Sequence, residues 1–329
     1  MRAPLILLPL SVFLSGCDGN QSALNAQGHS AILLKDLIVL IVGVCLVVWI
    51  AVMIVLAWSL TRRRDGQAGE DRGSEQRLGI WVSGAVAATV LIIGGLTILS
   101  FQTTRSLDRA GSPDLTIRVR AQQWWWQFIY EDADAGSFQT ANEIHIPVGK
   151  EVRVRLESTD VIHSFWVPSL AGKQDLVPGR ENVLTLRAER PGVYRGQCAE
   201  FCGLQHSHMA FFVIAEEEES YRQWAATQRR PGAQTGEAEA SAGKAVFMAR
   251  QCSACHTIRG TGAAGTTGPD LTHVGRRRTI AAGLMDNTRG SLAAWIADPQ
   301  TLKPGNNMPL VPLTSDELRQ LSAYMESLK

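Results

Sequence analysis

The sequence shows no excess of charge of either sign. Its 32 lysine and arginine residues are almost balanced by 31 aspartate and glutamate residues, which leaves a formal net charge of +1. A domain that binds nucleic acid usually carries a clustered basic excess, so the composition gives no reason to expect DNA or RNA as a partner. The 329 residues are enough for two or three domains.

Charged side chains are absent from two long stretches, residues 37–60 and 78–100. Each has about the ~20 apolar residues that a helix needs to cross a membrane, so we predict two transmembrane helices. Arginines follow the first stretch directly, beginning at Arg62. The positive-inside rule places the connecting loop, residues 61–77, in the cytoplasm, and both ends of the chain are therefore expected in the periplasm.

A third apolar run, residues 4–14, is too short to span the membrane and follows Arg2, which is typical of a signal peptide. Small residues precede Cys17 in the sequence Leu-Ser-Gly-Cys, and this ending resembles the lipobox of bacterial lipoproteins. The resemblance implies a signal peptide over residues 1–16, a lipid on Cys17 and a periplasmic segment over residues 17–36. The alternative is plain secretion without lipidation.

The pattern changes to a period of two after the second long stretch. Apolar and polar residues alternate from Leu115 to Arg120 and from Val152 to Leu156, which is typical of half-buried strands. Further strands are predicted at residues 183–186 and 211–214. These short strands, with proline and glycine at the turns between them, predict an all-β sandwich over residues 101–228.

A loop near the end of this region concentrates soft metal ligands. Cys198 to Met209 reads CAEFCGLQHSHM and contains thiols, imidazoles and a thioether, which are the donors that select copper. A mononuclear blue-copper site needs only one cysteine, whereas two thiolates can bridge two coppers. The loop places one imidazole well, that of His206, so a two-copper centre needs an earlier histidine, for which His163 is the candidate. His208 is expected to point away.

A disulfide between Cys198 and Cys202 is the alternative, since disulfides form in oxidising compartments. A disulfide gives no reason for a histidine and a methionine to stand at metal-ligand spacing on the same loop. The copper interpretation accounts for all four residues and is therefore favoured.

The copper loop and the segment DVIHSFWVPSLAGKQDLVPGR around His163 resemble the binuclear copper (CuA) loop and its partner segment in subunit II of cytochrome c oxidases. The resemblance covers roughly Leu33 to Trp224 and implies a cupredoxin-like fold for the β region. It also implies a magnesium ion at the interface with subunit I, reached by the side chain of Glu200. The implied copper ligands are His163, Cys198, Glu200 through its backbone carbonyl, Cys202, His206 and Met209.

Three consecutive tryptophans, Trp124 to Trp126, follow the second long stretch. A membrane-interface belt and core packing explain at least one of them. In the family that the copper loop resembles, the first tryptophan of this cluster is the point at which electrons enter, which implies that role for Trp124. The acidic residues between Glu131 and Asp134 either attract a basic cytochrome or form a solvated loop.

Residues 229–241 have the proline, glycine and glutamate content of a flexible linker. Beyond them, Cys252, Cys255 and His256 form the C-x-x-C-H signature of haem c, in which two thiols bond the vinyl groups and the histidine ligates iron. A disulfide with a spectator histidine is the alternative. Residues 242–329 resemble a small all-α class I cytochrome c.

The sixth ligand of the haem iron is predicted from the motif LKPGNNMP. It places Met308 in a loop flanked by proline and glycine, suited to reach the distal side of the haem. Met285, His273 and Met325 are competitors. Arginines 276–278 either pair with the haem propionates or form a solvated face. A haem with histidine and methionine ligands has a raised reduction potential, which suits the terminal end of a respiratory chain.

Both predicted centres carry one electron at a time, and the chain shows no cleft chemistry that consumes electrons. The resemblance therefore implies the electron-transfer subunit II of a bacterial cytochrome c oxidase with a fused cytochrome c domain, the caa-type arrangement, in the cytoplasmic membrane. Electrons would pass from a soluble cytochrome c or a membrane cytochrome complex to haem c, to CuA and to subunit I. There oxygen is reduced to water and protons are pumped. Subunits I and III are the implied partners.

Two other classes of protein stay open at this point. A CuA-containing nitric oxide reductase could receive the electrons in place of an oxidase. A membrane-anchored copper chaperone could use the paired cysteines and a histidine, but it would hold no haem. Stoichiometric haem therefore separates the chaperone from both electron-transfer hypotheses.

Overall fold

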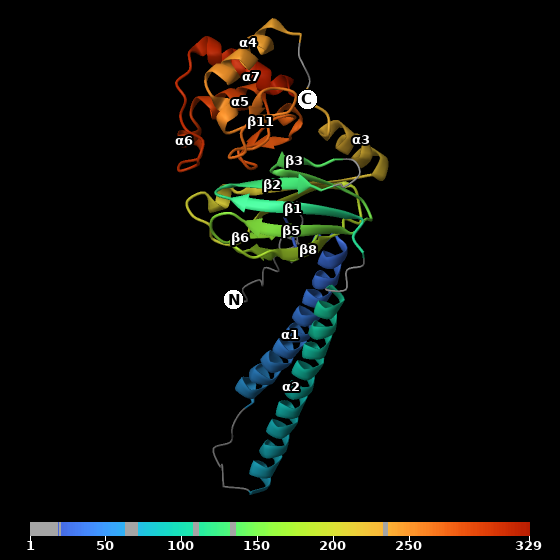
Figure 1. The fold of residues 1–329 in the computed structure, drawn as a ribbon. Coiled ribbons are helices and arrows are strands. Elements are labelled where there is room, and N and C mark those ends of the chain that lie inside the picture. The colour runs from blue at the N-terminus through green and yellow to red at the C-terminus, as the bar shows by residue number, and fades with distance from the viewer. Residues whose placement is uncertain (1–18, 20, 63–71, 108–111, 132–135, 233–235) are drawn as a thin grey trace, which may run out of the picture. The chain divides into compact units, whose positions relative to one another are not determined.

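The computed structural model, shown in Figure 1, describes residues 19, 21–62, 72–107, 112–131, 136–232 and 236–329. The predicted signal peptide with Cys17, Arg63 and Arg64 of the predicted loop, and the acidic pair Asp132 and Asp134 lie outside the described residues. The chain divides into two compact units. One holds the long helical hairpin, and the other holds the rest of the described chain.

The hairpin consists of α1 (His29–Thr61) and α2 (Arg72–Leu107), and each helix contains one of the two stretches without charge. The 33 residues of α1 span about 50 Å at 1.5 Å per residue, which exceeds the ~30 Å of the hydrocarbon core. Both helices thus extend beyond their apolar stretches, because backbone hydrogen bonding continues each helix into residues that lie outside the hydrocarbon core. Their most apolar windows bury no residue within the structure, so lipid is the environment that removes these side chains from water.

The other unit contains a sandwich of two five-stranded sheets, as predicted for the all-β region. The strands are β1 (Leu115–Gln122), β2 (Trp125–Tyr130), β3 (Phe138–Ala141), β4 (Glu143–Pro147), β5 (Val152–Ser158), β6 (His163–Trp166), β7 (Gln174–Leu176), β8 (Asn182–Leu186), β9 (Gly192–Cys198) and β10 (Ala210–Glu216). One sheet has the order β3-β2-β1-β5-β8 and the other β4-β10-β9-β6-β7. Neighbouring strands are antiparallel except in the pairs β1–β5 and β4–β10.

Alternation along the strands decides which face of each sheet is buried. Ile117 and Val119 in β1 are fully buried, and Ile117 lies opposite the equally buried Val154 of β5. Aromatic rings fill the space between the sheets, where the centroids of Trp126 and Phe211 are 5.0 Å apart. Each such side chain contributes roughly 1.5–3 kcal/mol by leaving water, so this core is the rigid support of the loops at the strand ends.

Helices surround a second, smaller core in the C-terminal part of the same unit. Its elements are α4 (Ala238–Ala249), η3 (Cys252–Ala254), β11 (Thr257–Ile258), β12 (Ala263–Ala264), η4 (Val274–Arg276), β13 (Thr279–Ile280), β14 (Met285–Asp286), α5 (Arg289–Ala297), α6 (Pro299–Leu302) and α7 (Ser315–Ser327), while α3 (Glu218–Gln228) follows the sandwich. A capping box between Thr314 and Glu317 begins α7 by satisfying backbone N–H groups that the helix leaves free. The buried side of α7 includes Leu321 and Tyr324.

A glycine permits the close crossing of α4 and α7. A Cβ placed on Gly243 would lie 2.0 Å from the backbone oxygen of Gln320 and 2.8 Å from the Cβ of Tyr324. Neither neighbour is the free end of a flexible side chain, so α7 would have to move to admit even one methyl group. Position 243 therefore requires glycine, because no side chain fits between α4 and α7 there.

Gly243→Ala should lower the stability of the helical domain by about 1–3 kcal/mol, the usual cost of overpacking a filled site. Thermal unfolding of this domain, followed by its haem absorbance, measures the change. Gly262→Ala is the matched control, because a Cβ there meets nothing nearer than the terminal carbon of Met248 at 3.5 Å. Equal midpoints for both variants would contradict the proposed close crossing.

A buried histidine joins β4 to β10. Nδ1 of His145 lies 2.9 Å from a carboxylate oxygen of Glu216, and Nε2 lies 3.1 Å from one of Glu143. The ring also stacks on Trp224 with centroids 4.0 Å apart. Burial alone would lower the pKa of His145, but the hydrogen bonds that its ring N–H groups donate to the two carboxylates outweigh it and raise that pKa. The imidazolium is therefore the stabilising form.

His145→Gln should destabilise the sandwich by ~2 kcal/mol, the order expected for a hydrogen bond to a charged group. Because the folded-state pKa is raised, the stabilisation is fully present below the unfolded pKa of about 6.5 and is lost as the pH rises through the folded pKa. Unfolding midpoints of both proteins should thus differ most near pH 6 and converge at pH 9. A constant difference across this range would show that the charge of His145 contributes nothing.

Candidate metal centre and haem pocket

The ends of paired strands bring the predicted copper ligands together. His163 begins β6 and Cys198 ends β9, 35 positions later. The two strands pair so that Phe165 lies opposite Cys198. The backbone N–H of Cys198 also donates to the carbonyl of Met209 at 2.9 Å. The loop between Cys198 and Met209 is therefore closed at its base by the β9–β10 ladder.

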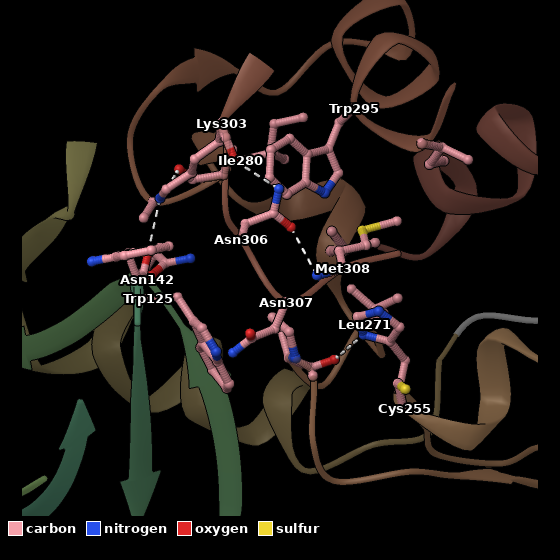
Figure 2. Close-up of a pocket in the computed structure, with 18 of the residues that line it drawn as sticks. Trp125, Asn142, Cys255, Leu271, Ile280, Trp295, Lys303, Asn306, Asn307 and Met308 are labelled. Carbon is pink, nitrogen blue, oxygen red and sulfur yellow. Dashed lines mark hydrogen bonds between the residues drawn. The ribbon is translucent and has the colours of Figure 1, made fainter. Parts of the chain in front are cut away.

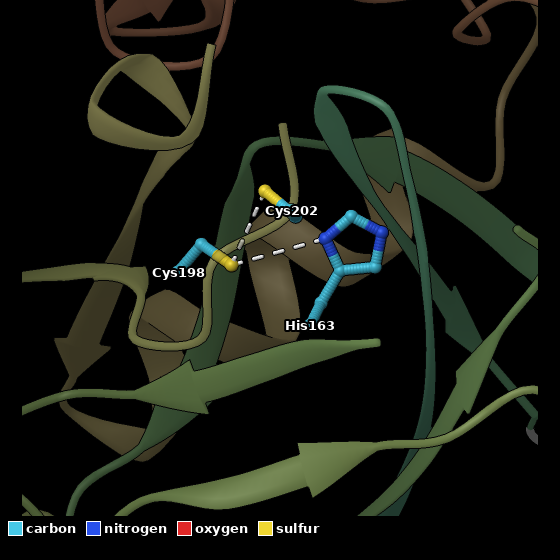
Figure 3. Close-up of side chains that lie close together, drawn as sticks. All are labelled: His163, Cys198 and Cys202. Atoms are coloured by element: carbon cyan, nitrogen blue, oxygen red, sulfur yellow. Dashed lines mark hydrogen bonds between the residues drawn. The ribbon is translucent and has the colours of Figure 1, made fainter. Parts of the chain in front are cut away.

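Imidazole and thioether groups surround two neighbouring thiols. The sulfur atoms of Cys198 and Cys202 are 3.7 Å apart, and Nδ1 of His163 lies 3.8 Å from the Cys198 sulfur (Figure 3). Nδ1 of His206 and Sδ of Met209 lie 3.6 and 3.8 Å from the Cys202 sulfur. Donors that share one metal at about 2.0–2.3 Å are separated by distances of this order, so the arrangement can hold metal without rebuilding the loop.

The structure also places Glu200, the remaining predicted ligand, and His208, the competitor of His206. The carbonyl oxygen of Glu200 lies 3.2 Å from the Cys198 sulfur, whereas its carboxylate is exposed. The side chain of His208 is exposed and hydrogen bonds to Gln205, away from the thiols. The described cysteines form no disulfide, so the alternative of a Cys198–Cys202 bridge is not the state that this structure shows.

His163 is held by a residue that sequence reasoning missed. Its side chain is fully buried, and its Nε2 lies 2.9 Å from a carboxylate oxygen of Asp160. A carboxylate in this position fixes the orientation of an imidazole and directs its other nitrogen towards a metal. The signal was present in the sequence as an acid three residues before the histidine, in DVIH.

The thiol pair is electrostatically coupled. The hydrogen bond from Cys202 lowers the pKa of Cys198 to about 4, and the same contact raises the pKa of Cys202. Metal ions bind cysteine as the thiolate, so metal binding at this pair would release any proton that the two sulfurs hold.

The three tryptophans have different environments. The indole N–H of Trp124 donates to the carbonyl of Cys202 at 2.9 Å, and its side chain is buried. Trp126 is a core residue whose indole faces the carbonyl of Met209 at 3.3 Å. Trp125 is half-buried beside a pocket in the helical domain (Figure 2). Trp124 and Trp126 thus pack in the core, and Trp124 is the member of the cluster that also contacts the copper loop and lines the pocket.

Glu131 is paired inside the chain. One carboxylate oxygen is hydrogen bonded to Arg118, and the other lies 3.3 Å from Arg155. Two guanidinium groups therefore neutralise the one acidic residue of this segment that the structure describes. The interpretation of Glu131 as a docking charge for a basic cytochrome gains no support from this geometry.

A mostly apolar pocket lies against the C-x-x-C-H motif. Cys255, His256 and Met308 line it together with Trp124 and Trp125, and Figure 2 shows Cys255 and Met308 among its walls. The Nδ1–H of His256 donates to the carbonyl of Pro269 at 2.8 Å, which leaves Nε2 free as a ligand. Burial lowers the pKa of His256, so the ring is in the neutral form that binds iron.

Of the predicted axial ligands, two methionines reach this pocket. Met308 lines it from the loop after α6, and Met325 lines it from the buried face of α7. Met285 and His273 are not among the described residues that line the pocket, and Nε2 of His273 lies 3.2 Å from the carbonyl of Arg230. Cys252 is a free, half-buried thiol at the start of the motif.

An unsatisfied donor in the pocket wall tests whether haem fits. The Nε of Arg277 is buried and has no hydrogen-bond partner among the described residues, while another nitrogen of the group donates to the carbonyl of Asp270. Burial lowers the pKa of Arg277. A ligand with carboxylate groups, such as haem with its propionates, would supply the acceptor. Arg276 and Arg278 are exposed, so only the middle arginine takes this position.

The described geometry defines a membrane-anchored redox protein in which a cupredoxin-like domain with paired thiols is joined to a cytochrome c-like domain. Residues 130–216 match the family model for the periplasmic domain of cytochrome c oxidase subunit II, and residues 240–329 match the model for cytochrome c. The chain belongs to the cytochrome c oxidase subunit 2 family.

Two relatives are similar to this chain over nearly their whole length. The chain is 38% identical over 337 residues to cytochrome c oxidase subunit 2 of Alkalihalophilus pseudofirmus, with 98% of this chain and 96% of the relative covered. It is 29% identical to the same subunit of Bacillus subtilis, with 100% and 98% covered. The crystal structure of the periplasmic domain of subunit II of the Bradyrhizobium japonicum oxidase is 32% identical and covers 36% of this chain and 96% of that chain, with a TM-score of 0.34.

Membership confirms the caa-type fusion and the three-part fold predicted from the sequence. The chain is an electron-transfer subunit of a membrane oxidoreductase complex with other oxidase subunits. Copper as CuA and haem c are the cofactors of its two matched families. A copper chaperone without haem does not fit a chain with a cytochrome c domain.

Proposed function

We propose that this subunit passes electrons from haem c to CuA and on to subunit I, where oxygen is reduced to water and protons are pumped. The observation that carries the proposal is that one side chain touches both sites. Trp124 lines the haem pocket and donates its indole N–H to the carbonyl of Cys202. The predicted electron entry residue thus lies between the two proposed centres.

The copper ligands proposed are those whose donor atoms cluster around the thiols. Cys198 and Cys202 would bridge two coppers, and Asp160 would hold the imidazole of His163 in its ligating orientation. When bound, the copper pair accepts and releases one electron with the charge spread over both metals. The outer ligands are His163, His206, Met209 and the carbonyl of Glu200.

The haem site proposed uses Cys252 and Cys255 as covalent attachments, with His256 and Met308 as axial ligands. The hydrogen bond from His256 to Pro269 keeps the free Nε2 directed into the pocket. A methionine ligand opposite the histidine raises the potential of the haem. Held by these residues, the haem would supply one electron at a time to a copper pair held by the cysteine loop.

Further parts of the assembly extend this proposal. The exposed carboxylate of Glu200 is free to reach a magnesium ion at the interface with subunit I. A soluble cytochrome c or a membrane cytochrome complex would reduce the haem, and subunit III would complete the complex. We place the protein in the bacterial cytoplasmic membrane with both ends in the periplasm and with lipid on Cys17.

The function is tested by purifying the complex through this chain and measuring its metals, its oxygen uptake and its nitric oxide turnover. Two coppers and one haem c in the subunit, with cyanide-sensitive oxygen uptake driven by reduced cytochrome c, are expected. Nitric oxide turnover without oxygen uptake would instead identify a nitric oxide reductase partner.

Cys202→Ser should abolish the near-infrared absorption band of CuA, because a hydroxyl does not replace a bridging thiolate. The haem c spectrum should remain, since its ligands lie in another domain. Optical spectra of the purified complex measure both. Cys45→Ser is the matched control, because Cys45 is an exposed residue of α1; a copper band that survives in Cys202→Ser would refute the ligand set.

Met308→Leu should lower the haem potential by on the order of 0.1 V, part of the ~0.8 V range that axial ligands span. The cause is loss of the thioether, while the size of the side chain is almost unchanged. A potentiometric titration followed at the haem absorption band measures the shift. Met325→Leu tests the other methionine of the pocket, and a larger shift there would assign the axial position to Met325.

A further inference from the structure

Lys303 is a buried lysine without a carboxylate partner among the described residues. Its side chain is 2% exposed, at the end of α6. Its ammonium donates to the backbone carbonyls of Trp124 at 2.9 Å, His208 at 2.8 Å and Ala281 at 3.0 Å. A buried lysine is normally paired with an acid, so three carbonyl acceptors in its place need an explanation.

The acceptors come from two domains. Trp124 and His208 belong to the cupredoxin-like domain, His208 within the copper loop and Trp124 in the turn between β1 and β2. Ala281 belongs to the haem domain, as does Lys303. Burial lowers the pKa of Lys303 to about 7, against a smaller raising effect of Cys202. One side chain thus ties the predicted electron entry residue to the haem domain.

Three further hydrogen bonds join the same two domains. The N–H of Ala210 donates to the carbonyl of Ala282 at 3.0 Å, and Gln205 donates to the carbonyl of Pro304 at 2.8 Å. The N–H of Arg278 donates to the carboxylate of Glu143 at 2.9 Å. Residues 278–308 of the haem domain therefore meet the cupredoxin-like domain at several backbone positions.

This contact covers Trp124, whose exposure is only 8%. A position so covered cannot also receive a diffusing cytochrome while the domains stay together. The segment that joins the two domains ends where α4 begins at Ala238, and within it the N–H of Gly232 donates to the carbonyl of Arg259 at 3.1 Å.

We propose that Lys303 is a positioning residue that holds the haem domain over Trp124. The fused haem is then the immediate electron donor to copper, and external cytochromes are excluded from Trp124. The inference rests on the proposed transfer from haem c to CuA. It adds that this transfer takes place in one docked arrangement, and not through free movement of the haem domain on its linker.

The test compares Lys303→Met with the parent in the purified, metal-loaded complex. Rapid mixing with reduced cytochrome c is followed at the haem c band and at the near-infrared copper band. In the parent, haem c should be reduced before copper. In Lys303→Met, transfer from haem c to copper should slow at least tenfold, and copper should begin to be reduced in parallel with the haem by the external donor.

Lys173→Met is the matched control, because Lys173 is exposed and makes no side-chain hydrogen bond or ion pair in the described part of the chain. Its transfer rate should stay within twofold of the parent. Lengthening the linker by ten glycine and serine residues should slow Lys303→Met further and leave the parent unchanged. A merely structural lysine would not make the rate depend on linker length.

Each outcome decides between defined alternatives. A parent rate in Lys303→Met with both bands intact would overturn the positioning role of Lys303 and leave the proposed function standing. Copper reduction in the parent while haem c stays oxidised would overturn the proposed function itself. If Lys303→Met loses either band, Gln205→Leu removes a different contact with the same loop, and an unchanged rate there overturns the locked arrangement.

Discussion

The geometry of the metal centre depends on holding two sulfur atoms side by side. Cys198 and Cys202 lie 3.7 Å apart in a buried loop, where two thiolates would repel each other. A metal bound to both sulfurs would relieve this repulsion by taking both charges. The sandwich supplies the restraint, because the loop begins at the end of β9 and returns directly into β10.

That restraint also bears on the proposed route between the two centres. Trp124 lies just after the end of β1, at the same end of the sandwich, and donates its indole N–H to the carbonyl of Cys202. Since its other side lines the haem pocket, the position of the copper loop and the position of the pocket are linked through one rigid ring. A rigid path of this kind suits electron transfer, which requires fixed distances and small changes in geometry.

Much of this site could be predicted from the sequence because its chemistry demands particular residue types at short spacing. The two cysteines, His206 and Met209 lie on one loop, and the haem attachment motif is contiguous. The distant His163 was a candidate because a two-copper centre needs an imidazole from earlier in the chain. The all-β part followed from alternation and the all-α part from the haem motif and the resemblance to cytochrome c, although the structure shows membrane helices that extend past the apolar stretches.

Of the three residues that escaped prediction, Gly243 and Lys303 act across long separations. Asp160 lies only three positions from His163, but its role depends on the turn before β6. Gly243 is needed because α7 crosses α4 at that point, and Lys303 matters because its acceptors lie 179 and 95 positions away. No local pattern contains such contacts, since they arise only when two domains or two helices are packed.

The balanced charge of this chain agrees with the proposed delivery of electrons by its own fused haem domain. Soluble redox partners commonly find each other through complementary charged surfaces, but Glu131 is neutralised by two arginines and Trp124 is covered. The contact that covers it uses an ammonium bound to backbone carbonyls, which does not depend on a matching acid. A donor fused to its acceptor needs no long-range attraction to find it, and the cupredoxin-like domain therefore has less need of a charged docking face of its own.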